Sequence, residues 1–130
     1  MRALVILSGI KRPFTPIDRS IVRGLYRLNV ETTTISPGKK LNERLTAAIR
    51  KQKPDFIFVL MGRRLTKKNM LWLKRMRYIP KAIWFTDDPY YLDWSRTVGR
   101  HFDIVFTNES CAVPVYRRNG CSRVYHMPLG

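Results

Sequence analysis

The chain has 130 residues, of which 45% are hydrophobic and 26% are charged, a composition typical of one folded domain. Twenty-five lysines and arginines against nine acidic residues give a net charge of +16. No apolar run reaches the roughly 20 residues that a membrane span needs, and no secretion signal is recognisable. We therefore expect a cytoplasmic protein, with docking at a membrane surface as an alternative.

The positive charge is concentrated in the first part of the chain. Residues 1–78 contain nineteen basic and four acidic side chains, whereas residues 79–130 contain six and five. Such an asymmetry predicts an acidic partner, and four classes fit it: nucleic acid, an anionic membrane surface, an anionic substrate polymer or a negatively charged neighbouring domain.

Cysteine and histidine are scarce. Cys111 and Cys121 are expected to be reduced, because nothing in the sequence indicates secretion. His101 and His126 lie far apart, and no Cys/His spacing is typical of zinc, so no metal site is predicted.

Strand and helix patterns alternate through the first sixty residues. Apolar or β-branched runs predict strands at 2–8, 30–35 and 55–60. Helical spacing predicts helices at 17–28 and 41–52. The apolar side chains of the first helix that we expect to face the sheet are Ile17, Ile21, Leu25 and Leu28. A basic row on another face of that helix consists of Arg19, Arg23 and Arg27.

The second half continues this alternation. The predicted elements are a helix at 66–76, a strand at 81–85, a short helix or loop after residue 89, a strand at 103–107, a helix at 112–119 and a strand at 123–126. Regular alternation predicts a three-layer, Rossmann-like α/β sandwich over residues 1–130. We expect a parallel sheet of about six strands in the order 2-1-3-4-5-6, with right-handed crossovers and the second strand near an edge.

Two adjacent carboxylates end the fourth predicted strand. Asp87 and Asp88 follow the apolar run at 82–85, and Pro89 stops the strand. Ligands of open parallel sheets bind just beyond the carboxyl ends of the strands, so these acids are the best candidate site. The alternative is a plain turn in which an aspartate caps the following helix.

Glycines and cations follow the first and third predicted strands, at the same edge of the sheet. We expect these residues to hold an anionic group: Gly9, Lys11, Arg12, Gly62, Arg63 and Arg64. No complete phosphate-binding glycine motif is present, so an ordinary β-to-α turn is the alternative for Gly9. Tyr90 is a candidate for stacking on a sugar or base, and His126 is a weaker candidate near the cleft.

Motifs in the second half resemble the N-terminal domain of GT-B glycosyltransferases, most closely the spore maturation protein CgeB-like family. The resemblance rests on Trp84-Phe85-Thr86-Asp87-Asp88-Pro89, on Asp103-Ile104-Val105-Phe106-Thr107-Asn108, on Tyr116 with Gly120, and on the closing residues 124–130. It covers residues 83–130 well and residues 2–62 only as a strand–helix rhythm.

The resemblance implies two Rossmann-like domains that face a cleft. This chain would be the N-terminal domain, which presents the acceptor, while a C-terminal domain would hold the nucleotide-sugar donor. Such enzymes generally need no bound metal, and this domain alone would not transfer sugar. The resemblance implies Asp88 as the base and Asp87 as the residue that orients the acceptor. The charge of +16 departs from the family and leaves the acceptor open.

A different class of function also fits the composition. A non-enzymatic, basic nucleic-acid-binding module would use the arginine row and the cations of residues 63–77, with steep salt dependence. A receiver-like phosphoacceptor domain ranks last, because strand one ends in Ser8-Gly9 without an acidic pair.

Overall fold

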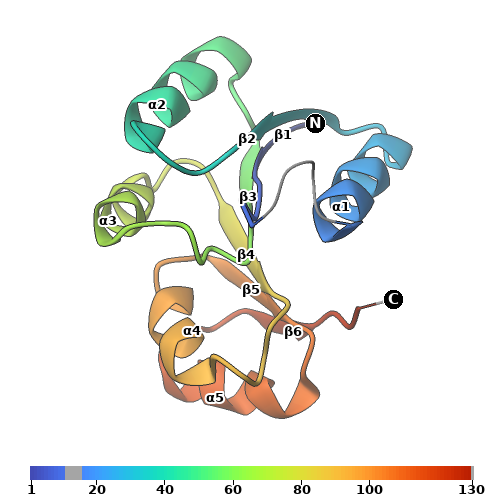
Figure 1. Ribbon diagram of the computed structural model, residues 1–130, viewed down its shortest axis with the longest axis vertical. Coiled ribbons are helices and arrows are strands. Elements are labelled where there is room, and N and C mark those ends of the chain that lie inside the picture. The colour runs from blue at the N-terminus through green and yellow to red at the C-terminus, as the bar shows by residue number, and fades with distance from the viewer. Residues whose placement is uncertain (11–15, 130) are drawn as a thin grey trace.

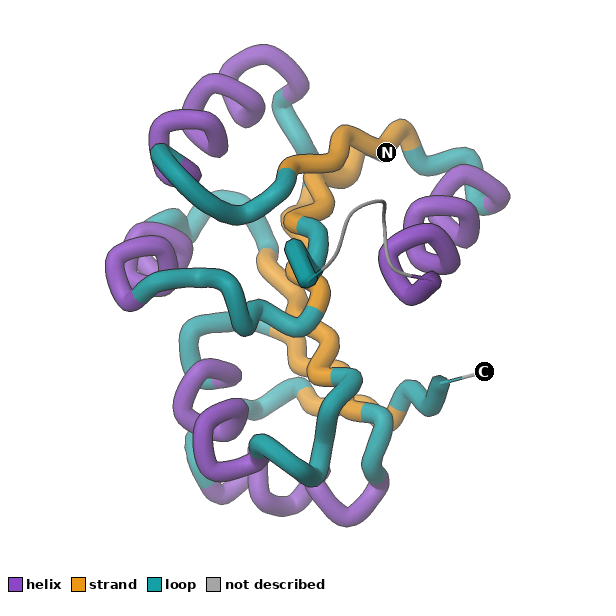
Figure 2. The backbone as a smooth tube through the Cα atoms, in the orientation of Figure 1, coloured by secondary structure: helices purple, strands orange, loops and turns teal. Residues whose placement is uncertain are grey.

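The computed structural model describes residues 1–10 and 16–129. Its elements in chain order are β1 (Arg2–Ile6), α1 (Pro16–Arg27), β2 (Glu31–Ile35), α2 (Leu41–Gln52), β3 (Phe56–Leu60), α3 (Lys67–Arg75), β4 (Lys81–Phe85), α4 (Leu92–Gly99), β5 (Ile104–Thr107), η1 (Ser110–Ala112), α5 (Val113–Arg118) and β6 (Val124–His126). The six strands form one parallel sheet in the order β2-β1-β3-β4-β5-β6, which confirms the predicted fold and strand order (Figure 1). Figure 2 shows the strands running through the middle of the molecule, with helices on both sides.

The direction of each crossover decides which face of the sheet its helix covers. Only the step from β1 to β2 runs toward the β2 edge, and every later step runs toward β6. Because parallel crossovers are right-handed, reversing the step moves the helix to the opposite face. Accordingly α1 lies alone on one face, and α2, α3, α4 and α5 lie on the other (Figure 1).

The two faces have separate cores. Beneath α2–α5 the sheet contributes fully buried side chains such as Leu4, Ile57 and Ile83. On the α1 face the buried cluster is smaller and includes Phe58 and Trp84. Strand residues alternate between the two cores, as expected when both sides of a sheet are apolar.

One predicted core residue of α1 lies outside the core. Ile17, Ile21 and Leu25 pack against the sheet, but Leu28 is 74% exposed. The helix ends at Arg27, so Leu28 lies beyond its last turn, and it lines the rim of an open hollow between α1 and the sheet. The helical spacing therefore predicted the sheet-facing residues of α1 correctly up to Leu25 and wrongly for Leu28.

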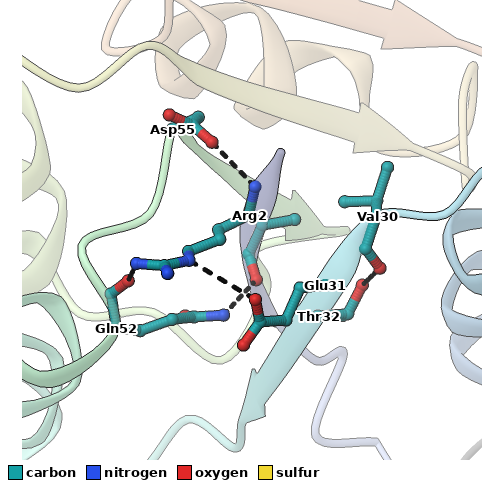
Figure 3. Close-up of polar contacts among 7 residues, drawn as sticks. Arg2, Val30, Glu31, Thr32, Gln52 and Asp55 are labelled. Carbon is teal, nitrogen blue, oxygen red and sulfur yellow. Dashed lines mark hydrogen bonds and ion pairs between the residues drawn. The ribbon is translucent and has the colours of Figure 1, made fainter.

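A polar network ties the strands together at the amino edge of the sheet, opposite the candidate site (Figure 3). The backbone N–H of Arg2 donates to Asp55 Oδ2 at 2.7 Å, and its guanidinium donates to the Gln52 carbonyl at 2.9 Å. The same guanidinium lies 3.4 Å from Glu31 Oε2. These contacts join β1 to β2, to the end of α2 and to the start of β3.

The segment after Pro89 contains the eight-residue helix α4, in agreement with the short helix or loop predicted there. The helix predicted at 112–119 begins earlier, as the 3-10 turn η1, whose start is capped by the Glu109 carboxylate. None of the described helices is both long and apolar enough to cross a membrane.

Candidate functional site at the carboxyl edge of the sheet

Two glycines shape the loops at this edge. Gly9 follows β1 with φ +70°, and a Cβ there would lie 2.5 Å from Pro37 Cγ. Gly62 follows β3 with φ +71°, and a Cβ there would lie 2.9 Å from Ile83 Cδ1. Backbone conformation and close packing thus account for both glycines, and their predicted contact with a ligand stays a prediction.

Asp88 lies inside the protein rather than on its surface. It is 3% exposed and accepts three hydroxyl hydrogen bonds, from Ser95 at 3.0 Å, Thr107 at 2.7 Å and Tyr116 at 2.6 Å. The Tyr116 hydroxyl also lies 2.8 Å from Ser95 Oγ. We call these four residues the Asp88 hub; it joins the end of β4 to α4, β5 and α5.

Tyr116 is the largest side chain of this hub. It is fully buried, and its ring stacks on Phe85 with centroids 5.4 Å apart. Burial, followed by the hydrogen bond to Asp88, raises the pKa of the Tyr116 phenol well above its ordinary value of 10.0. The phenol is therefore a permanent hydrogen-bond donor at physiological pH.

Asp87 has the opposite environment. Its side chain is 36% exposed, and its Oδ2 lies 3.2 Å from Arg63 Nη1. The guanidinium of Arg63 lies 4.0 Å from the centroid of the Tyr91 ring, a cation–π contact. Arg63 thus holds the Asp87 carboxylate in place and leaves part of it open to solvent.

The surface beside Asp87 is only slightly hollowed. A depression of about 10 Å³ is lined by residues that include Thr86, Asp87 and Trp94. The Thr86 hydroxyl is buried and has no hydrogen-bond partner within the described part of the chain. This volume suits one water molecule, so a sugar-sized ligand would lie above the corner rather than inside it.

A second hollow at this edge lies between the starts of α2 and α3. It has a volume of about 430 Å³, and its lining includes Lys39, Lys40 and Lys68. A hydrogen bond of 2.8 Å from Asn69 to Asn42 joins the two helix starts below it. Lys39 and Lys40 were not among our predicted site residues, although they follow the turn after the second strand and hence the same edge.

The remaining predicted site residues are scattered. Arg64 is exposed and its Cγ approaches Gly9. Tyr90 is 86% exposed in the turn after Asp87, and its N–H donates to the Asp87 carbonyl. His126 is exposed at the end of β6, where its Nε2 lies 3.3 Å from the Asn108 carbonyl.

Lys11 and Arg12 lie outside the described residues. Within residues 1–10 and 16–129, no three histidine, cysteine or acidic side chains are grouped as a metal site would require. Of the predicted site residues, Arg63 and Asp87 form a side-chain contact, and Tyr90 lies in the turn after Asp87 with its side chain exposed.

The architecture is that of a Rossmann-like α/β domain with a partly exposed carboxylate at the carboxyl edge of its sheet. The cations at this edge, which we call the basic rim, are Lys39, Lys40, Arg63, Arg64 and Lys68. In sequence, the chain is a distant homologue of the spore protein CgeB of Bacillus subtilis (strain 168), with 31% identity over 129 residues. The match covers 99% of this chain and 39% of CgeB, and no family model matches the chain.

Proposed function

We propose that the chain is the acceptor-side domain of a glycosyltransferase, with a nucleotide-sugar donor held by a second domain. The similarity to CgeB, the motif resemblance at residues 83–130 and the Rossmann-like sheet support this class. The observation that carries the proposal is the Asp87 carboxylate, which is partly exposed and held by Arg63 where such sheets bind ligands.

The geometry favours Asp87 over Asp88 as the base. A general base must reach the proton that it takes from the acceptor hydroxyl. Asp88 is buried and already accepts three protein hydroxyls, whereas Asp87 has only one side-chain partner, Arg63, among the described residues. We therefore assign proton transfer to Asp87, and to Asp88 the positioning of the corner.

The basic rim favours an anionic acceptor. Lys39, Lys40 and Lys68 line a hollow of about 430 Å³, and Arg63 and Arg64 lie at the same edge. A sugar-phosphate or polyol-phosphate chain presents repeated anions that such a rim can hold. The acceptor hydroxyl would then lie over Asp87.

NMR titration of the labelled chain with a glycerol-phosphate oligomer tests acceptor binding. We expect saturable shifts at the amides of Arg63, Asp87 and Lys40, and at least a tenfold loss of affinity in Arg63→Ala. The control is Arg96→Ala, because Arg96 pairs with Asp93 on α4. Equal affinity of the two variants would contradict the proposed site, as would tight binding of a nucleotide sugar, which we assign to the second domain.

Sugar transfer by the native protein tests the base. Asp87→Asn should lower turnover by about 100- to 10,000-fold, the usual contribution of a general base. Asp93→Asn is the matched control, because Asp93 is also an exposed carboxylate beside an arginine. Unchanged turnover in Asp87→Asn would remove it from the reaction.

The alternative function is non-enzymatic binding of nucleic acid. It is favoured by the net charge of +16 and by the exposure of Arg19, Arg23 and Arg27 along α1. However, α1 and the basic helix α3 lie on opposite faces of the sheet, so they do not form one basic surface (Figure 1). Affinity for a DNA duplex that falls steeply with salt and is unchanged in Arg63→Ala would support this alternative.

A further inference from the structure

Within residues 1–10 and 16–129, α1 covers only part of its face of the sheet. A groove of about 500 Å³ runs between α1 and strands β3, β4 and β5. Its lining is almost wholly apolar and includes Ile21, Leu25, Phe58, Ala82, Phe106 and Met127. Parallel sheets are normally covered by helices on both faces, and of the helices that the structure describes only α1 lies on this face (Figure 1).

Small residues line the hollow on the α1 side and on the sheet side. Ser20 and Gly24 form one wall, and a Cβ added at Gly24 would meet no atom within 4 Å. Ala82 lies in the floor of the groove opposite them. The axes of two packed helices lie roughly 8–10 Å apart, and the distance depends on the side chains at the contact. Small side chains such as these therefore allow another helix to approach closely.

Aromatic and aliphatic side chains extend the apolar surface at the ends of the groove. Phe58 contacts Phe106 with ring centroids 6.1 Å apart, and Phe106 contacts Tyr125 at 5.9 Å. Tyr125 is 52% exposed and Leu28 is 74% exposed. The patch is thus larger than the hollow itself, which is typical of an interaction surface.

The groove is bordered by positive charge. The exposed charged residues of α1 are Arg19, Arg23 and Arg27. At 3.6 residues per turn, Arg23 and Arg27 lie beside the stripe formed by Ser20 and Gly24. A complementary partner would carry acidic residues along the same border.

We propose that this groove is the docking site for an acidic amphipathic helix. An apolar stripe on that helix would fill the hollow, and acidic flanks would face Arg23 and Arg27. A second copy of this chain fits less well, because two chains of charge +16 repel each other. The proposal is independent of the transferase function.

The test uses a stapled synthetic helix of about five turns, with leucine on one face and glutamate on both flanks. Fluorescence anisotropy measures its affinity for the full chain, and NMR shifts locate it. Two comparison peptides carry lysine for every glutamate, or the same composition in scrambled order. We expect the acidic amphipathic helix to bind at least tenfold more tightly than either, with shifts at Ala82 and Phe106.

Matched variants separate the groove from the general charge of the chain. Gly24→Leu places a bulky side chain in the hollow and should lower affinity at least tenfold, whereas Gly24→Ala, which adds one methyl group, should lower it less than threefold. Arg23→Glu with Arg27→Glu should lower affinity at least tenfold. The same reversal at Arg50 and Lys51, exposed on α2 and hence on the other face, should lower it less than threefold.

Three results would overturn the proposal. The first is equal binding of the scrambled and amphipathic peptides, or no effect of Gly24→Leu. The second is a dimer in sedimentation that Gly24→Leu dissociates, since the groove would then bind a second copy. The third is a fatty acid that occupies the groove and competes with the acidic peptide.

Discussion

The two sides of the corner after β4 differ sharply. On the inner side, the Asp88 carboxylate is buried among three hydroxyl groups that the fold supplies. On the outer side, the Asp87 carboxylate is partly exposed and has one arginine partner. Neighbouring residues of identical chemistry thus divide two tasks: one carboxylate fixes the shape of the corner, and the other remains accessible for a ligand.

Asp88→Ala should have the largest effect on stability. It leaves the hydroxyls of Ser95, Thr107 and Tyr116 without their shared acceptor in the interior, and each unsatisfied buried group costs about 1–3 kcal/mol. We expect the free energy of unfolding to fall by about 3 kcal/mol or more, measured in urea. Asp87→Ala is the control, with a loss below about 1 kcal/mol because exposed ion pairs contribute little. Similar losses in the two variants would remove the distinction between the two sides.

Tyr116→Phe should have an intermediate effect. The ring can still stack on Phe85, but the hydroxyl bond to Asp88 is lost. A loss of about 0.5–1.5 kcal/mol at pH 7 is expected, the usual net contribution of one hydrogen bond. A loss as large as that of Asp88→Ala would mean that this hydroxyl alone organises the hub.

The raised pKa of Tyr116 predicts a pH dependence that this variant removes. Above pH 10 the unfolded tyrosine ionises while the folded one keeps its proton, so unfolding releases a proton and the free energy of unfolding falls as pH rises. Tyr116 alone should lower the free energy of unfolding by about 1.4 kcal/mol for each pH unit above pH 10. Urea unfolding between pH 9 and about 11 should show a steeper decline in the unmodified chain than in Tyr116→Phe, and parallel curves would contradict this.

Arg63→Lys should have the smallest effect on stability. Lysine keeps the positive charge beside Asp87 but loses the planar group that lies over Tyr91. The change in unfolding free energy should be below about 1 kcal/mol, since both contacts are near the surface. Ligand affinity at the corner should fall several-fold, and NMR titration with the glycerol-phosphate oligomer would show it. A stability loss above about 2 kcal/mol would make Arg63 a structural residue.

The fold was predictable because its signals are local. The uninterrupted apolar run at β3 and the helical spacing of α2 each lie within about a dozen residues, and their alternation indicates a parallel sheet between helices. Alternation allows more than one strand order, so the order 2-1-3-4-5-6 was a choice among these that the structure confirms. The inward position of Leu28 was predicted wrongly, since helical periodicity marks an apolar stripe without showing where the covering layer ends.

Which of the two aspartates is buried and which is exposed could not be predicted from the neighbouring residues in the sequence. The hydroxyl partners of Asp88 are 7, 19 and 28 residues further along the chain, and Ser95, Thr107 and Tyr116 each have ordinary alternative roles. The sequence motif therefore located the corner correctly, whereas the assignment of the base to Asp88 stays a prediction that the geometry does not favour. The hollow that Lys39 and Lys40 line with Lys68 could not be predicted either, because only the folded chain places the start of α2 beside that of α3.

The spacing of the Asp88 hub has a consequence for synthesis on the ribosome. Asp88 leaves the exit tunnel before each of its partners, and Tyr116 follows it by 28 residues. Until α5 has emerged, the Asp88 carboxylate lacks the Tyr116 hydroxyl and keeps its water molecules. Burying it at the nascent β4 corner would therefore be unfavourable. We expect the corner and the Asp87 carboxylate that it presents to be shaped late, when the last third of the chain docks, even though β1 and β3 can pair much earlier.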